Sequence, residues 1–266
     1  MQTIIFIHGA WLTPLCWDKF ITFFSKKGFN CIAPPWPYHE DSIKDLIKRP
    51  KKELASLGIE EIIRYYEKII RQQKEPPILI GYSFGGLFVQ MLLDRGLGKA
   101  GIAIASAPPK GILPLYFSVI KSIFSVISTP FGWKKTRMLS FKDFQYAFAH
   151  TLPISEQRAI YAKYLVPETG RIFFQALAAP FTQTTEINFS NGKRAPLLLI
   201  AGELDKICPA SQIRKNFHKY KKSSAKTSFK EFKGRTHWII AQEGWGEVAN
   251  YILNWQKNAL KKSKSN

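Results

Sequence analysis

The 266-residue chain is poor in cysteine and in acidic residues, and each shortage narrows what it can be. Its three cysteines, Cys16, Cys31 and Cys208, are odd in number and are not spaced as metal ligands. They predict neither a disulfide framework nor a zinc site. We therefore expect three small packing residues in a reduced, cytoplasmic protein that holds no metal.

A long uninterrupted apolar run is also missing. The longest apolar stretch, 112–128, contains Lys121 and several serines, which makes it too short and too polar for a transmembrane helix. The first residues show neither a basic region nor a small-residue cleavage site. No secretory signal is therefore expected.

Acidic residues number 19 against 39 lysines and arginines, which gives a formal net charge of +20. Such an excess indicates either an anionic partner or a lysine-rich surface that serves solubility, and the second interpretation is favoured. Zinc-finger spacing, an RNP-like aromatic segment and basic repeats are all missing. The sequence therefore predicts no nucleic-acid partner.

Short apolar runs predict a parallel sheet. The runs 3–7, 30–33, 78–80, 102–105 and 197–200 are apolar on consecutive residues. Strands have this pattern when helices cover both faces of a parallel sheet. A further segment, 227–232, alternates more and suits an edge strand. Helical periodicity between these runs completes the pattern of a mostly parallel, doubly wound α/β sheet of about six strands.

The alternation of strands and helices is interrupted once, between residues 110 and 189. This segment lacks a convincing buried strand and contains amphipathic aromatic stretches such as 141–150 and 172–181. We expect 110–189 to form a helical cap inserted into an α/β core made of 1–109 and 190–266.

A glycine-rich turn at 81–86 is the central motif. Its sequence, Gly-Tyr-Ser-Phe-Gly-Gly, lies between the buried strand 78–80 and an apolar helix predicted over 87–93. A serine on such a sharp turn has an exposed hydroxyl, and the small residues two before and two after it let strand and helix approach closely. The start of the helix also favours a developing oxyanion. Ser83 is therefore predicted to be a nucleophile.

A serine nucleophile needs a general base and a carboxylate that orients that base. His237 follows the last predicted strand, at the kind of strand end where open α/β sheets form their sites. The loop after strand 197–200 offers Glu203 and Asp205. Asp205 is favoured because it lies farther from the strand and just before a predicted turn, and Glu203 is the open alternative. The order Ser, Asp, His is that of α/β-hydrolases.

An acyl-transfer site also needs hydrogen-bond donors for the oxyanion. The backbone N–H of Phe84, directly after the nucleophile, is one expected donor. The loop after the first strand should supply the other, with Ala10 as first choice and Trp11 as the alternative. His8 is expected to bond to the backbone of this loop.

These motifs together resemble the α/β-hydrolase superfamily. In chain order they are 8–10, 81–86, 202–205 with Pro209, and 234–237 followed by Gly244 and Trp245. The early first strand and the His-Gly-Ala opening followed by Trp17 resemble compact members such as plant methylesterases and hydroxynitrile lyases. The resemblance covers roughly 1–109 and 190–266, and it implies an α/β-hydrolase fold with serine chemistry. After the second strand, 34–39 departs from the Asp-x-x-Gly stretch that is common in the superfamily.

The predicted site implies hydrolysis of a carboxylic ester, or a related acyl bond, of a hydrophobic small molecule through an acyl-serine, without a cofactor. Trp11, Tyr82 and Trp238 are the expected substrate-binding residues. The same residues could instead serve a hydroxynitrile-lyase-like enzyme, a C–C bond hydrolase, a perhydrolase or a non-enzymatic ligand receptor.

The aromatic side chains of the predicted cap are expected to include residues that line the substrate pocket. They are Tyr116, Phe117, Phe124, Phe131, Trp133, Phe144 and Phe148. The apolar segment 112–127 has basic neighbours and is also a candidate for docking on an anionic membrane surface. A buried cap helix is the favoured interpretation. The sequence does not predict the oligomeric state.

Overall fold

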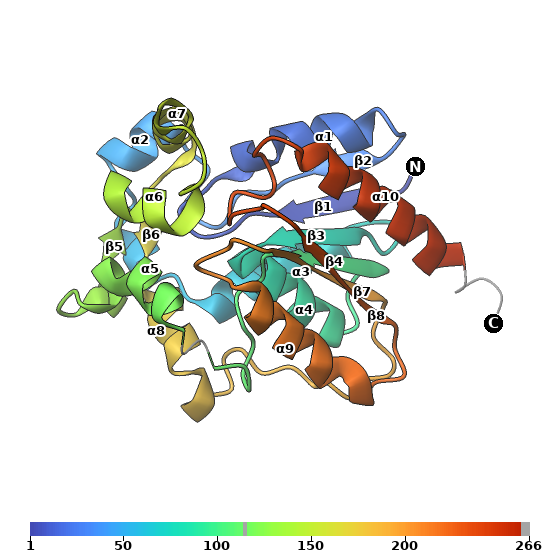
Figure 1. The fold of residues 1–266 in the computed structure, drawn as a ribbon. Helices are drawn as coiled ribbons and strands as arrows, with labels where there is room; N and C mark the ends of the chain where they lie inside the picture. Colours follow the sequence, from blue (N-terminus) through green and yellow to red (C-terminus); the bar gives the residue numbers. More distant parts are fainter. Residues whose placement is uncertain (114–115, 262–266) are drawn as a thin grey trace.

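The computed structural model describes residues 1–113 and 116–261, which are built around a six-stranded parallel sheet (Figure 1). The strand order is β2-β1-β3-β4-β7-β8. The strands are β1 (Thr3–Ile7), β2 (Asn30–Ile32), β3 (Ile78–Tyr82), β4 (Ala100–Ile104), β7 (Leu197–Gly202) and β8 (Thr227–Phe232). The predicted fold class is confirmed, and the alternating segment 227–232 is an edge strand.

Helices cover both faces of the sheet (Figure 1). One face carries α1 (Asp18–Ser25) and α10 (Trp245–Lys261), and the other carries α3 (Ile59–Arg71), α4 (Phe84–Asp94) and α9 (Ala210–Lys219). The short 3₁₀ turns η1 (Pro14–Trp17) and η5 (Tyr220–Lys222) adjoin α1 and α9. Because both faces are covered, the side chains of the central strands β3, β4 and β7 are fully buried.

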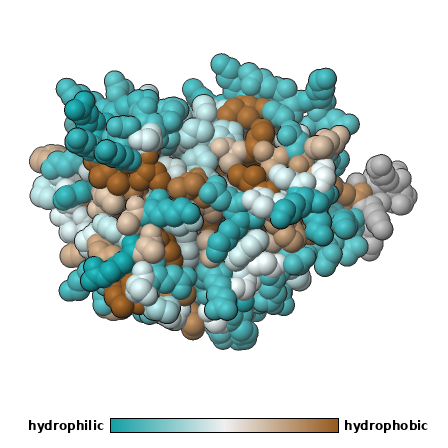
Figure 2. Space-filling view, turned by 90° about the horizontal axis from the view of Figure 1, so that it is seen from above, coloured by the Kyte–Doolittle hydropathy of each residue, from teal (hydrophilic) through white to brown (hydrophobic). Residues whose placement is uncertain are grey.

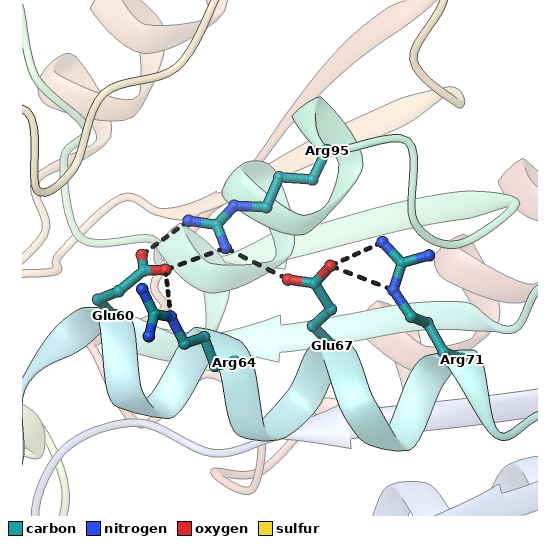
Figure 3. A network of polar contacts seen from close by, with 5 residues as sticks. All are labelled: Glu60, Arg64, Glu67, Arg71 and Arg95. Atoms are coloured by element: carbon teal, nitrogen blue, oxygen red, sulfur yellow. Dashed lines mark hydrogen bonds and ion pairs between the residues drawn. The ribbon is translucent and has the colours of Figure 1, made fainter.

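Helix α3 shows how local sequence sets the packing. Its apolar stripe is buried, while its outer face carries a network of ion pairs (Figure 3). Glu60 pairs with Arg64, and Glu67 with Arg71, at the i,i+4 spacing of helical neighbours. Arg95, just after α4, reaches both glutamates, at 2.7 and 3.3 Å. The network therefore ties α3 to the end of α4 across the surface.

The segment between β4 and β7 forms a group of short elements beyond one end of the sheet (Figure 1). They are α5 (Phe117–Ile127), η3 (Gly132–Lys134), β5 (Thr136–Arg137), α6 (Phe141–Phe148), α7 (Ile154–Tyr164), β6 (Glu168–Thr169), α8 (Arg171–Leu177) and η4 (Ala179–Phe181). Strands β5 and β6 pair antiparallel, a ribbon that the sequence did not indicate. Two-residue strands are too short to show a periodic pattern.

The loop after β2 joins this group. It contains α2 (Ile43–Lys48) and η2 (Lys52–Ser56), and η2 contacts β6 and η3. The Thr169 hydroxyl and the Arg171 side chain donate hydrogen bonds to the carbonyl oxygens of Ala55 and Ser56. No helix within the described ranges is long and apolar enough to cross a membrane.

His8 joins the loops that follow β1 and β2. The backbone N–H of Trp36 donates to His8 Nε2 at 3.1 Å, and the two rings stack with centroids 4.8 Å apart. Because Nε2 accepts, the proton lies on Nδ1, which donates to the Gly9 carbonyl at 2.9 Å. This confirms the expected backbone bonding of His8. Burial, together with the nearby His39, lowers the pKa of His8 from its ordinary 6.5 to about 3.

This lowered pKa predicts a loss of stability at acidic pH. Between pH 6.5 and about 3 the unfolded chain binds a proton at His8 that the folded chain does not, so stability falls as the pH falls. The protonation of His8 in the unfolded chain lowers the free energy of unfolding by ~3 kcal/mol between pH 7 and pH 4. Urea unfolding of the wild type and of His8→Gln across this range should show a shallower pH dependence in the variant. The exposed His218→Gln should keep the wild-type slope, and equal slopes for all three proteins would contradict the assignment.

The turn between β3 and α4 requires glycine for close packing. A Cβ at Gly85 would meet the carbonyl oxygens of Ile7 and His8, the latter at 2.6 Å, and a Cβ at Gly81 would meet the backbone of Gly85. Backbone atoms cannot move aside as a flexible side chain can. The start of α4 therefore lies against the end of β1 only because these positions have no side chain.

Gly85→Ala should cost about 2 kcal/mol or more in the free energy of unfolding, since the clash is with backbone. Gly246→Ala is the matched control, because it lies in α10 and its added Cβ would meet no other atom. That control should be neutral or slightly stabilised. Chemical denaturation of both variants measures the difference, and similar values for the two would show that the turn can relax.

Candidate active site

Ser83 lies at the junction of β3 and α4 in a strained backbone conformation. Its φ and ψ are 57° and −119°, in a region that residues other than glycine rarely adopt. Its N–H donates to the Ile104 carbonyl at 2.9 Å, and its carbonyl accepts from the N–H of Ala107 at 3.0 Å. The end of the neighbouring strand β4 thus holds the strained turn in place.

His237 and Asp205 form a buried pair near this turn. His237 lies between β8 and α10, and its Nδ1 lies 2.6 Å from Asp205 Oδ2. Both side chains are fully buried. The other carboxylate oxygen of Asp205 accepts from the N–H groups of Ile207 and Cys208, at 2.9 and 2.8 Å. These bonds satisfy the buried carboxylate and place the imidazole proton on Nδ1.

The opposite ring nitrogen of His237 is free to accept a proton. Nε2 is buried and has no hydrogen-bond partner among the residues that the structure describes. The Ser83 hydroxyl is therefore not hydrogen-bonded to it in this structure. Catalytic hydrogen bonds are often long without substrate and shorten only in the complex.

Tyr82 brings the serine turn and the histidine loop together. Its hydroxyl donates to the His237 carbonyl at 2.7 Å, and its ring lies 4.8 Å from the imidazole, centroid to centroid. Burial raises the pKa of the Tyr82 phenol well above its usual value, and the charge of Asp205 adds to this, so the hydroxyl remains a donor. Phe148 of α6 packs edge-on against the imidazole at 4.9 Å. The residue next to Ser83 therefore fixes the backbone of His237.

Glu203, the alternative acid, is engaged elsewhere. Its carboxylate accepts from Lys233 Nζ at 2.7 Å and from the N–H of Gly234 at 2.9 Å. The bond from Lys233 is the main reason that the pKa of Glu203 lies below its usual value. The structure brings Asp205, and not Glu203, to His237.

A narrow apolar cavity of about 50 Å³ opens beside Ser83. It is lined by Ala10, Trp11, Ser83, Phe84, Ala107, Pro108, Val119, Ile123, Phe173, Ala176, Leu177, Ile207 and Cys208. Core loops supply one side, and helices α5 and α8 supply the other. The two predicted oxyanion donors, Ala10 and Phe84, thus border the same space as the serine.

Trp11 is held in an unusual conformation by the segment between β4 and β7. Its φ is 62°, its indole N–H donates to the Arg137 carbonyl at 3.0 Å, and its own carbonyl accepts from the N–H of Val166 at 3.0 Å. Burial raises the pKa of the Glu168 carboxylate, and the backbone N–H of Trp11, which faces that carboxylate, acts against the rise. Of the two donors considered in this loop, Trp11 is therefore turned toward Glu168, which leaves Ala10 as the candidate.

Glu168 and His39 form a second buried pair behind this loop. Glu168 Oε2 lies 3.5 Å from His39 Nε2, and both side chains are fully buried. Burial raises the pKa of Glu168, whereas His39 and the N–H groups of Thr169 and Trp11 act in the opposite direction. Neither residue was singled out from the sequence, because His39 lies in an irregular loop and Glu168 in a two-residue strand, and neither belongs to a motif.

Of the three predicted substrate-binding residues, one lines the cavity. Trp11 lines it, whereas Tyr82 and Trp238 are fully buried and do not. The Tyr82 hydroxyl is used to hold His237, and Trp238 packs on Tyr164 with centroids 5.2 Å apart. Both side chains contribute to the packing of the loops around Ser83 and His237.

The aromatic residues expected to line a pocket also lie elsewhere. Phe144 and Phe148 are buried in the core, and Phe117, Phe124, Phe131 and Trp133 are exposed. The cavity uses Phe173 and Phe84 in their place. No group of three His, Cys, Asp or Glu side chains gathers as a metal site within the described residues.

Comparisons with known proteins agree with this architecture. Residues 4–250 match the model of the alpha/beta hydrolase family. No match was found among curated proteins.

Among solved structures, a monoacylglycerol lipase of Paleococcus ferrophilus is 22% identical with a TM-score of 0.66, over 95% of this chain and 93% of the other. An extracellular alpha/beta-hydrolase from a Paenibacillus species is 19% identical with a TM-score of 0.68, over 96% and 98%. An Arabidopsis methylesterase is 15% identical with a TM-score of 0.67, over 97% and 99%. At these identities the structures support the fold, and the family match covers most of the sequence. The chain belongs to the alpha/beta hydrolase family.

Proposed function

We propose that the protein is a serine hydrolase that cleaves a carboxylic ester of a small hydrophobic molecule. The observation that carries this proposal is the buried His237–Asp205 pair beside a strained serine that opens into an apolar cavity. The names of the similar structures, a monoacylglycerol lipase and a methylesterase, are in keeping with ester chemistry. No cofactor is required.

In the first half of the reaction, His237 Nε2 takes the proton of the Ser83 hydroxyl as Oγ attacks the ester carbonyl. Asp205 stabilises the imidazolium that forms. The N–H groups of Ala10 and Phe84 stabilise the tetrahedral oxyanion, and the start of α4 adds its dipole. His237 then returns the proton to the leaving alcohol, which departs and leaves an acyl-Ser83.

In the second half, His237 takes a proton from water as the water attacks the acyl group. The proton then passes to Ser83 Oγ when the tetrahedral intermediate collapses, which releases the acid and restores the serine. Ser83 and His237 must approach each other from their present separation, because they are not hydrogen-bonded in this structure. Substrate in the cavity excludes water and favours that contact.

The segment 110–189 acts in this proposal as a cap over the site. Its residues Val119, Ile123, Phe173 and Leu177 form an apolar wall opposite the serine. A cavity this narrow suits a short acyl or alcohol group. Because none of its lining side chains is charged, it offers no cation for a leaving cyanide. The cyanohydrin-lyase alternative is therefore disfavoured.

Ser83→Ala should abolish turnover of p-nitrophenyl acetate and labelling by a fluorophosphonate probe, since the covalent step needs the hydroxyl. Ser190→Ala is the control, because Ser190 is exposed and its hydrogen bond uses only the backbone N–H. Asp205→Asn should lower kcat by roughly 10³-fold or more, and Glu203→Gln should leave it near the wild-type value. Turnover in Ser83→Ala would refute the proposal, and labelling of the wild type without turnover on any ester would indicate a ligand receptor.

Ile123→Ala should shift selectivity toward longer acyl chains. The substitution removes part of the cavity wall, and one methylene in an apolar pocket is worth about 1–3 kcal/mol of discrimination. The ratio of kcat/KM for p-nitrophenyl hexanoate over acetate should therefore rise by about 10-fold or more. Ile120→Ala on the outer face of α5 is the matched control and should leave the ratio unchanged. An equal rise in both variants would mean that α5 does not shape the pocket.

A further inference from the structure

Helix α5 is apolar on two opposite faces, and only one of them is packed. Val119, Ser122, Ile123 and Val126 are buried. On the outer face Phe117, Ile120 and Phe124, at i, i+3 and i+7, are 79%, 38% and 58% exposed. The prediction of a buried cap helix therefore describes only one face. A helix in water gains nothing from an exposed apolar stripe.

Two more aromatic side chains extend this surface beyond the end of α5. Phe131 is 63% exposed and Trp133 is 41% exposed, with ring centroids 5.5 Å apart. Trp133 also packs on Phe174 of α8, which anchors the pair to the cap. We call the surface formed by Phe117, Ile120, Phe124, Phe131 and Trp133 the outer apolar face. Figure 2 views the molecule from above and shows hydrophobic patches among hydrophilic side chains on that side.

The stretch of chain that forms the outer apolar face is rich in basic residues. No Asp or Glu occurs between Asp94 and Asp143, whereas this stretch contains several lysines and arginines. An open pocket of about 460 Å³ next to η3 is lined by Lys52, Ala55, Lys134, Lys135, Thr136 and Arg137. Among the residues in the described ranges, none of these four cations pairs with a carboxylate. Four unpaired cations around one hollow attract an anion.

We infer that this face docks on bilayers that contain anionic phospholipid. The exposed aromatic and aliphatic side chains would enter the boundary between headgroups and acyl chains, and the basic pocket would receive lipid phosphates. An anionic bilayer would contact both the outer apolar face and the basic pocket at once. A nucleic acid would use the cations without the stripe on α5, and a second copy would set cation against cation.

The geometry also links docking to the cavity. Val119 and Ile123 on the inner side of α5 line the cavity beside Ser83, one helix diameter from the outer apolar face. Docking would therefore place the cavity wall at the lipid surface, where hydrophobic esters accumulate. This link rests on the proposed function, whereas the docking itself does not.

Vesicle co-sedimentation of the full chain tests the inference. Wild-type protein should pellet with vesicles of phosphatidylcholine and phosphatidylglycerol, should bind phosphatidylcholine alone far more weakly, and should be released by salt. The double variant Lys134→Glu/Lys135→Glu should bind the anionic vesicles at least roughly 10-fold more weakly. Phe117→Ser/Phe124→Ser should lose binding as well, even at low salt.

The control for charge is Lys26→Glu/Lys27→Glu, an exposed pair at the end of α1 far from the cap (Figure 1). It makes the same change in net charge and should bind like the wild type. The control for apolar exposure is Ile47→Ser on α2. Circular dichroism and turnover of soluble p-nitrophenyl acetate show that each variant is folded.

Absence of wild-type binding to anionic vesicles would overturn the inference. So would an equal loss in both lysine pairs, since binding would then depend only on net charge. If millimolar inorganic phosphate displaced the protein from the vesicles, the basic pocket would be a site for a free anion. That result would also overturn the inference. Vesicle binding without any esterase turnover would leave docking in place and refute the proposed function, so the two failures are distinguishable.

Discussion

The hydrogen bond between Asp205 and His237 is the interaction on which the site depends. A carboxylate buried without partners would be costly, yet each oxygen of Asp205 is engaged, one by the imidazole and the other by the N–H groups of Ile207 and Cys208. The loop after β7 therefore has to fold tightly around this side chain. Its conformation in turn fixes the tautomer of His237 and leaves Nε2 as the acceptor.

The segment between β4 and β7 contacts the loop after β1, which contains Trp11, and the loop after β8, which contains His237. Trp11, which borders the cavity, is bonded to Arg137 and Val166 and faces Glu168, all of which belong to that segment. Phe148 of the same segment packs on the His237 ring, and its carbonyl accepts from the N–H of Trp238. The segment between β4 and β7 thus helps to support both the loop that contains Trp11 and the loop that contains His237. A shift of its helices would move both.

The sequence was informative wherever a motif coincided with a strong packing pattern. Parallel strands buried on both faces are continuous apolar runs, so the sheet could be predicted. Ser83 could be proposed because it follows such a run, and His237 because it follows the edge strand β8 at the same end of the sheet. Glu168 and His39 could not be found, since a buried pair between a two-residue strand and a distant loop has no local signature.

Most of the aromatic residues that were expected to line the pocket lie elsewhere for a related reason. Periodicity shows that α5 is apolar, but both of its faces are apolar, and only the tertiary structure decides which face meets the core. Tyr82 and Trp238 also do not line the cavity. Their positions beside Ser83 and His237 were informative, although their side chains brace the loops and do not reach the cavity.

Part of the basic charge of the chain lies next to the outer apolar face, at Lys52, Lys134, Lys135 and Arg137. A lysine-rich coat that served only solubility would have its cations interspersed with carboxylates, as on α3, where each glutamate of the network meets an arginine. Among the described residues, Lys52, Lys134, Lys135 and Arg137 pair with no carboxylate, and the exposed aromatic side chains of Phe131 and Trp133 lie just before Lys134 in the chain. A need for solubility does not explain why these aromatic side chains are exposed. Their exposure in turn does not explain why the stretch 95–142 contains no Asp or Glu. A surface that meets water on one side and anionic lipid on the other accounts for both.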